Sequence, residues 1–226
     1  MQFVVEDEFW GLFPEAMIGT VVVHGLDNTR SAEKCTALLI EQIENTSYAL
    51  ADTEIPSLLS VSPWRSAYQQ FGVKPSKFKS SIENLLRSAS SGRLRSINPL
   101  VDLYNVVSLR YQLPCGGEDL ATIGGAIRLT RAVGGEHFVP LGGTENDPPP
   151  VGAVIYRDDL GVICSCWNWR EADRTKLTEA TTDAFLCIEA LPPTDANSLR
   201  AACDDLALLV ITHLGGDAEV TLHTRG

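Results

Sequence analysis

Residues 98–120 read NPLVDLYNVVSLRYQLPCGGEDL, a stretch that begins like a capped helix and ends in a break. Asn98 can cap the helix with its side-chain oxygen, and Pro99 suits the first helical position because no backbone N–H is needed there. Apolar residues then recur at the spacing of one helix face. The residues expected to face the core are Leu100, Leu103, Val107 and Tyr111.

Two short polar side chains, Asp102 and Asn105, lie on a stripe next to this apolar face. Both are weak helix formers, so their presence indicates either hydrogen bonds to neighbouring loops or a functional site. The helix is expected to end before Pro114, and Cys115-Gly116-Gly117 is expected to form the tip of a turn.

Before this stretch the pattern changes from β to α. Residues 2–5 and 18–24 are rich in β-branched side chains and predict strands, and a helix is expected to follow with Ser31 as its cap. Two further amphipathic helices are predicted, one with Ser62 as its cap and Gly72 as its stop, the other ending at Gly92.

After residue 117 the texture becomes β. Apolar runs separated by turn residues predict strands, and residues 158–161, DDLG, read as the turn of a hairpin. Residues 144–152, TENDPPPVG, predict an exposed loop because prolines cannot sit inside a strand ladder. A last helix, capped by Thr194, is expected before a strand at 218–223. The predicted strand runs lie within 126–133, 134–143, 151–169 and 183–191.

These patterns predict an α+β fold in which mixed β-sheets pack against helices. No flexible linker interrupts the patterning, so the chain is expected to be a single domain, 1–226. Within it, residues 1–55 are expected to form a strand and helix unit that packs on a core module, 56–226.

The composition limits the partners. The net charge is −11 with a pI near 4.8, which opposes non-specific attraction to DNA or any other phosphate backbone. An RNA contact must therefore be local, and the basic stretch 74–95 is the candidate, although it could equally be a solvated helix face. The RNA-binding residues predicted there are Lys74, Lys77, Lys79, Arg93 and Arg95.

Metal and cofactor chemistry finds little support in the sequence. The six cysteines lack CxxC spacing and the four histidines lack ligand spacing, so we expect reduced thiols, no metal and no cofactor. The familiar hydrolase and nucleotide-binding motifs are missing, and a complete aminoacyl-tRNA synthetase is not expected. The sequence has neither a long apolar run nor a signal-like N-terminus, so we expect no membrane partner and a cytoplasmic location.

The stretch around Asn105 carries a resemblance. Residues 101–120 resemble the D-x-T-N and G-x-P-x-H-A-F-D segments of the B3/B4 module of bacterial phenylalanyl-tRNA synthetase β subunits, and residues 134–143, 181–189 and 194–216 are similar to later parts of that module. Residues 62–87 and WNWR at 167–170 resemble free-standing B3/B4 proteins. The residues in register without a gap are Asp102, Asn105, Pro114 and Asp119.

This resemblance implies a B3/B4 domain whose pocket hydrolyses tyrosine wrongly attached to phenylalanine tRNA. Such a reaction needs a positioned water, donors for the developing oxyanion and a group that recognises the side chain. By resemblance, Glu189 matches the glutamate that senses the tyrosine hydroxyl in the family. The implied catalytic residues are Asn105 and Glu136, and the implied substrate-binding residues are Glu189, Arg170, Asn168 and Thr181.

The chain also departs from the family pattern. Gly116 stands at the position of the family histidine, Tyr104 at that of its threonine and Pro99 at that of its arginine. The bulky run 166–170, CWNWR, replaces a Gly-Gly pocket floor and is expected to reshape or fill the cavity. These departures count against hydrolysis by the synthetase's own arrangement of residues.

Three functions remain open at this point. The first is binding of tRNA or aminoacyl-tRNA, with hydrolysis of a mischarged aminoacyl-tRNA in trans. The second is a pocket for a free amino acid or similar small molecule between Asn105, Glu136, Arg170 and Glu189, without catalysis. The third is a scaffold that acts through protein contacts. The charge favours the last two, while the basic stretch and the resemblance favour the first.

Overall fold

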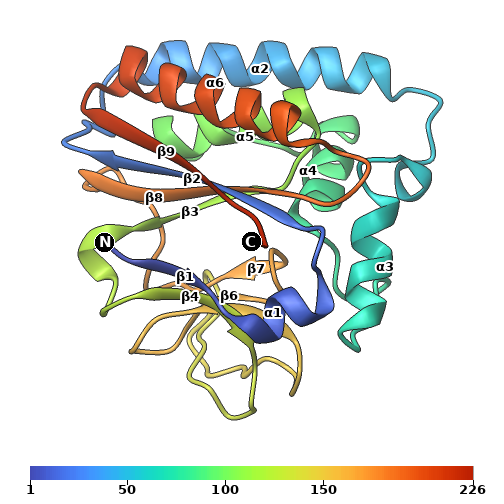
Figure 1. The fold of residues 1–226 in the computed structure, drawn as a ribbon. Helices are drawn as coiled ribbons and strands as arrows, with labels where there is room; N and C mark the ends of the chain where they lie inside the picture. Colours follow the sequence, from blue (N-terminus) through green and yellow to red (C-terminus); the bar gives the residue numbers. More distant parts are fainter. Residues whose placement is uncertain (226) are drawn as a thin grey trace.

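Two β-sheets and six α-helices make up the fold in the computed structural model, which describes residues 1–225 (Figure 1). The first sheet has the strand order β1-β4-β5-β6-β7, in which β1 and β4 are parallel and the other pairs antiparallel. Its strands are β1 (Phe3–Val5), β4 (Ile127–Arg131), β5 (Val154–Arg157), β6 (Val162–Ser165) and β7 (Arg170–Glu171).

The second sheet is antiparallel throughout, with the order β3-β8-β2-β9. Together the two sheets and the helices confirm the predicted α+β class with a mixed sheet. The strands of the second sheet are β3 (Cys115–Asp119), β8 (Asp183–Ala190), β2 (Met17–His24) and β9 (Asp217–His223).

The molecule is layered. Two long helices pack on the outer face of the four-stranded sheet, a third packs against one of them, and the inner face of the sheet turns toward the five-stranded sheet (Figure 1). The shorter helices lie at one side and close the space between the sheets there. The helices on the sheet are α5 (Pro99–Tyr111) and α6 (Ala196–Leu214), and α2 (Ala32–Ala49) packs against α5. The shorter helices are α1 (Asp7–Leu12), α3 (Ser62–Gln70) and α4 (Ser81–Ser90), and the 3-10 turns are η1 (Ile55–Ser57) and η2 (Leu120–Thr122).

Strand β8 shows how the layers assign side chains to the two faces. Successive residues of a strand point to opposite faces. Leu186 and Ile188 belong to the core under the helices, whereas Phe185 belongs to the core between the sheets. The same alternation turns Cys187 and Glu189 toward the space between the sheets. The Glu189 carboxylate is thereby placed between the two sheets.

Helix α5 begins as predicted. The Asn98 side chain accepts a hydrogen bond from the Val101 N–H at 3.1 Å. The Asp102 carboxylate accepts bonds from the Ile97 N–H at 3.0 Å and the Ser96 hydroxyl at 2.6 Å, so it fastens the preceding loop. The helix ends at Gln112, whose φ of 52° is left-handed. Of the two polar residues on the stripe, Asp102 therefore holds the backbone and Asn105 does not.

Several predicted local features were wrong. Residues 115–119 form strand β3 and not a turn, because they pair with β8 as the edge of the antiparallel sheet. Residues 134–143 form no strand beyond one bridge, Pro140 to Ala172. Asp195 caps α6 in place of Thr194. Ser31 takes a left-handed φ and caps nothing with its side chain, and Ser62 lies inside α3.

Residues 1–55 interlock with the remainder. Strand β2 lies between β8 and β9, and β1 pairs with β4. Phe9 of α1 contacts Trp167 edge to face at 4.9 Å between ring centroids. Loss of β2 would leave two unpaired strand edges. None of the helices within residues 1–225 is long and apolar enough to cross a bilayer.

The single-domain prediction has a direct test by limited proteolysis. Because β2 contributes the middle of a sheet, cleavage near residue 55 is expected to destabilise the whole chain rather than release a stable piece. Mass spectrometry of the digest should show the intact chain giving way to small peptides. A persistent fragment of residues 60–226 that keeps the thermal transition of the intact chain would contradict the prediction.

Candidate functional site

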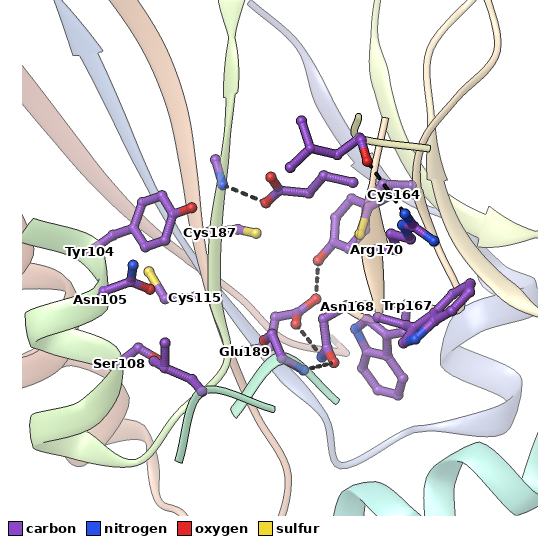
Figure 2. A pocket seen from close by; sticks show the side chains of 18 residues that line it. Tyr104, Asn105, Ser108, Cys115, Cys164, Trp167, Asn168, Arg170, Cys187 and Glu189 are labelled. Atoms are coloured by element: carbon purple, nitrogen blue, oxygen red, sulfur yellow. Dashed lines mark hydrogen bonds between the residues drawn. The ribbon is translucent and has the colours of Figure 1, made fainter. Parts of the chain in front are cut away.

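A cavity of about 420 Å³ lies between the two sheets. Helix α5, strands β3 and β8, the N-terminus of α4 and the turn at 166–171 all contribute to its wall. Figure 2 shows Tyr104 and Asn105 on one side, Asn168 and Arg170 on the other, with Glu189 between them. Segments far apart in the sequence thus meet around one space.

Four of the six residues predicted for catalysis or substrate binding line this cavity: Asn105, Asn168, Arg170 and Glu189. Glu136 does not, because its carboxylate folds back on its own loop and accepts hydrogen bonds from the N–H groups of Val133 and Gly134. Thr181 does not either. It is buried, and its hydroxyl donates to Asp119 at 2.7 Å.

Glu189 is 1 % exposed, and protein donors occupy both of its oxygens. The Tyr156 hydroxyl donates to Oε1 at 2.5 Å, and the Asn168 amide donates to Oε2 at 2.6 Å (Figure 2). Burial raises the pKa of Glu189 to about 7, against the lowering effect of these hydrogen bonds. Tyr156 of the chain therefore binds the carboxylate that, by the resemblance, would bind the hydroxyl of a tyrosyl ligand.

Asn168 extends this network to the helical side of the cavity. Its side-chain oxygen accepts hydrogen bonds from the Tyr68 hydroxyl at 3.0 Å and from the Ser81 N–H at 3.3 Å. Tyr68 belongs to α3, and Ser81 begins α4. Glu189 and Asn168 thus tie β8, the 166–171 turn and two helices into one hydrogen-bonded wall.

Two polar groups on the wall are free for a ligand. The Asn105 amide has no hydrogen-bond partner among residues 1–225 within the lengths that such bonds allow. Glu171, which the sequence reasoning missed, receives only a 3.4 Å contact from the Gly117 N–H. Burial raises the pKa of Glu171 to about 7.

Glu171 was missed because it belongs to no motif and lies in a strand of two residues. The one sequence signal was Gly116, where the resembling family carries histidine. A Cβ atom on Gly116 would lie 2.9 Å from Glu171 Oε1. The carboxylate of Glu171 therefore fills the space that a side chain at position 116 would need.

The turn 166–170 lines the cavity without filling it, so of the two effects expected from its bulk, filling does not occur. Cys166 and Trp167 both adopt left-handed φ angles, 51° and 65°. This conformation is unfavourable for residues with a Cβ. It places the indole of Trp167 in the aromatic core, where the ring centroids of Phe9, Phe13 and Trp64 lie 4.8 to 4.9 Å from its own.

Cations and aromatic rings alternate at one side of the cavity mouth. Trp169 meets Phe78 edge to face at 4.7 Å between centroids. Lys77 Nζ lies 5.1 Å from the Phe78 ring centroid, and the Arg170 guanidinium carbon lies 5.9 Å from that of Trp169. The two rings are partly exposed and the two cations exposed. We call Lys77, Phe78, Trp169 and Arg170 the rim.

The predicted RNA-binding residues fall into two groups. Lys74, Lys77 and Lys79 precede α4, on the side of the rim, while Arg93 and Arg95 follow α4. Ten helical residues at 1.5 Å each separate the groups by about 15 Å. Arg95 donates to the carbonyls of Gly92 and Leu94. Of the two groups, only the first is linked to the cavity wall, because Lys77 contacts Phe78 and Phe78 contacts Trp169.

The described residues, 1–225, hold no group of three or more potential metal ligands, and none of their histidines lines the cavity. Their six cysteines are unpaired. Burial raises the thiol pKa of Cys164 and Cys187 well above the ordinary value, which leaves little thiolate to act as a nucleophile. The cavity is thus equipped for binding through amide, carboxyl and aromatic groups.

The raised pKa of Glu189 predicts a pH dependence of stability. The folded protein keeps this proton up to about pH 7, whereas a glutamate with the model value releases it near pH 4.5. Between these values the unfolded state binds fewer protons, so stability falls as pH rises, by at most about 1.4 kcal/mol per pH unit for one group. Glu189→Gln is expected to flatten this fall in denaturant titrations from pH 5 to 7.

The exposed Glu145 provides the control for that titration, because Glu145→Gln should keep the wild-type slope. Glu118 and Glu171 also have raised pKa values and keep part of the slope in every variant. Equal slopes in wild type and Glu189→Gln would show that Glu189 ionises at an ordinary pH.

Comparisons with known proteins place the chain in a family and a fold. The family described as B3/4 domain matches residues 63–215. A crystal structure of an N-terminal fragment of the phenylalanyl-tRNA synthetase β-subunit from Pyrococcus horikoshii superposes with a TM-score of 0.52 at 12 % identity. The match covers 96 % of this chain and 50 % of that one, so the chain spans half the length of that fragment. No curated protein matches the sequence.

Proposed function

Since the chain belongs to the B3/4 domain family, we propose that it binds the aminoacylated 3′ end of a tRNA, with the aminoacyl group in the cavity between the sheets. The fold is that of a module found in a tRNA synthetase subunit. The observation that carries the proposal is the junction of the cavity with the rim, because one end of such a ligand is a small amino-acid group and the other is a nucleotide.

The cavity suits the aminoacyl group. Its volume of about 420 Å³ lies within the range of small-molecule sites. Its wall offers the unused Asn105 amide and the Glu171 carboxyl between aromatic faces. Ser81 Oγ is buried at this wall without a hydrogen-bond partner among residues 1–225. Buried polar groups normally have partners, so a ligand with polar groups would complete the site.

The rim suits the terminal nucleotide. Unpaired bases of RNA are bound by stacking on aromatic side chains, and cations beside those rings meet the phosphates. Trp169 offers a partly exposed ring, and both Arg170 and the Phe78–Lys77 pair lie next to it. With a net charge of −11, the chain can attract RNA only through such a local group of cations.

We propose binding as the main function and hydrolysis only as an additional one. Gly116 and Tyr104 replace the histidine and threonine of the resembling synthetase modules, and no imidazole lines the cavity within residues 1–225. The Asn105 amide remains available as a donor to an oxyanion. Trans hydrolysis of a mischarged aminoacyl-tRNA is therefore the finer form of the proposal, and it requires a water positioned by groups other than histidine.

A panel of mischarged tRNAs tests both forms. Each is incubated with the protein, and both the release of the amino acid and the affinity at two salt concentrations are measured. Salt-sensitive binding of aminoacylated tRNA supports the proposal, and catalytic release of the amino acid extends it to editing. The proposal would be overturned if every tRNA of the panel bound no more tightly than a random RNA of equal length.

A second candidate is favoured by the charge. The acidic chain repels polyanions, and the wall of the cavity by itself suffices for a free amino acid. Calorimetry with the twenty standard amino acids distinguishes this candidate. Binding of a free amino acid as tight as that of the same aminoacyl group on tRNA would favour a metabolite-binding protein.

A further inference from the structure

We propose that Glu171 binds the free ammonium group of the ligand, so that the cavity selects aminoacyl groups with an unmodified α-amine. This inference rests on the proposed function, because it concerns the aminoacyl group in the same cavity. It adds the chemical feature by which the ligand is recognised there.

Two carboxylates line the cavity, Glu171 and Glu189, and only Glu171 has most of its hydrogen-bonding capacity unused. Glu189 receives two short hydrogen bonds from Tyr156 and Asn168. Glu171 receives one, from the Gly117 N–H, at a distance of 3.4 Å. A carboxylate can accept about four hydrogen bonds, so Glu171 can take the N–H donors of an ammonium group.

Glu171 also lacks a counter-charge. Two buried carboxylates elsewhere have one, since Glu83 pairs with Arg65 at 2.9 Å and Asp158 pairs with Arg174 at 2.8 Å, whereas the buried Glu189 is satisfied by two neutral donors. Within residues 1–225, no basic nitrogen lies within 4 Å of the Glu171 carboxylate. A partly buried carboxylate with neither a counter-charge nor a short hydrogen bond can accept a cation from outside the chain.

The nearest cation of the wall does not fill this role. Arg170 is exposed, donates to the Leu141 carbonyl at 3.4 Å and lies over Trp169. The titratable side chains that line the cavity together with Glu171 on α5, β3 and β6 carry no positive charge; they are Tyr104, Cys115 and Cys164. The Arg174 guanidinium, which acts on the neighbouring Glu118, is paired with Asp158.

Glu118 follows Gly116 by two residues on β3 and so lies on the same face of that strand. It is 5 % exposed, and its Oε2 has no hydrogen-bond partner. Burial, and after it the charge of Glu171, raises the pKa of Glu118 well above its ordinary value. Two adjacent carboxyls that compete for a proton release it when a cation arrives. An ammonium ion beside Glu171 would relieve this repulsion.

Aromatic faces complete the site for a cation. Tyr104, Tyr156 and Trp167 line the cavity together with Glu171, and the faces of aromatic rings attract ammonium groups. An α-amine is mostly protonated at pH 7, since its pKa is about 7.7 to 8.0. The ammonium of an aminoacyl group therefore matches both the carboxylate and the rings.

The test uses adenosines that carry an aminoacyl group through a stable 3′ amide link. An equimolar mixture with the twenty standard side chains is passed at pH 7 over the immobilised protein, beside the same mixture with acetylated α-amines. Retained compounds are identified by mass spectrometry. We expect retention of free-amine compounds and an affinity lower by about 30-fold or more for the acetylated forms, as is common when a buried charge loses its partner.

Glu171→Gln supplies the second arm, because it preserves shape and removes charge. The variant is expected to lose the preference for the free amine, while Glu145→Gln, in an exposed loop, keeps it. Equal retention of both mixtures, or an unchanged preference in Glu171→Gln, overturns the ammonium inference and leaves the proposed function standing. Retention of neither mixture overturns the proposed function itself.

Discussion

Replacing Trp167 by alanine is expected to lower the free energy of unfolding by about 3 to 5 kcal/mol, the usual cost of removing a large buried aromatic side chain. Trp167 is fully buried, and it is the ring on which Phe9, Phe13 and Trp64 converge. These rings come from α1, the segment after it and α3. The variant is expected to loosen the N-terminal unit from the cavity floor at the same time.

Trp169 is the matched control, since it is the same residue type two positions along the same turn. Its ring is partly exposed at the rim, so Trp169→Ala should cost far less stability. Denaturant unfolding of both variants measures the difference. Equal losses of stability in the two variants would contradict the assignment of Trp167 to the core and Trp169 to the rim.

The second large expected effect is a loss of affinity for aminoacylated tRNA when the rim residues are replaced. A variant with Lys77→Ser, Trp169→Ala and Arg170→Ser is expected to bind aminoacylated tRNA about 100-fold more weakly or worse. One stacked base contributes about 1 to 3 kcal/mol, and two cations add their phosphate contacts. The slope of log affinity against log salt should fall by about 0.7 for each lost contact. Binding titrations at three salt concentrations measure both quantities.

Arg93 and Arg95 provide the control for the rim, because they were predicted to bind RNA but lie at the far end of α4. Arg93→Ser with Arg95→Ser should leave most of the affinity, as these residues do not adjoin the cavity. A larger loss of affinity in this double variant than in the rim variant would show that the RNA contact lies away from the cavity mouth.

Local sequence patterns predicted much of the fold. The cap at Asn98, the strand at β8 and the hairpin around Asp158 each rest on residues within a few positions of one another, which is the range over which propensity and capping act. Strand β3 was missed for the opposite reason. Its glycines have low strand propensity, and only the neighbouring β8 gives them a ladder.

The candidate site was predictable in part. Asn105 drew attention as a polar residue on a mostly apolar helix, and it faces the cavity. Glu189 and Asn168 were placed at the cavity through resemblance, although the sequence could not show that they bind each other. Glu171 could not be predicted, because its burial and its place opposite Gly116 arise from the packing of two separate sheets.

The central claim is that the cavity holds the aminoacyl group, and the most direct test is one ratio of affinities. The affinity for tRNA with a stable amide-linked aminoacyl group is compared with that for the same tRNA deacylated. Burial of an amino-acid side chain contributes about 1.5 to 3 kcal/mol, so we expect a preference of about 10-fold or more for the aminoacylated form. Asn105→Leu should reduce this preference. Equal affinity of the wild-type protein for the two tRNAs, across all amino acids tried, would contradict the account.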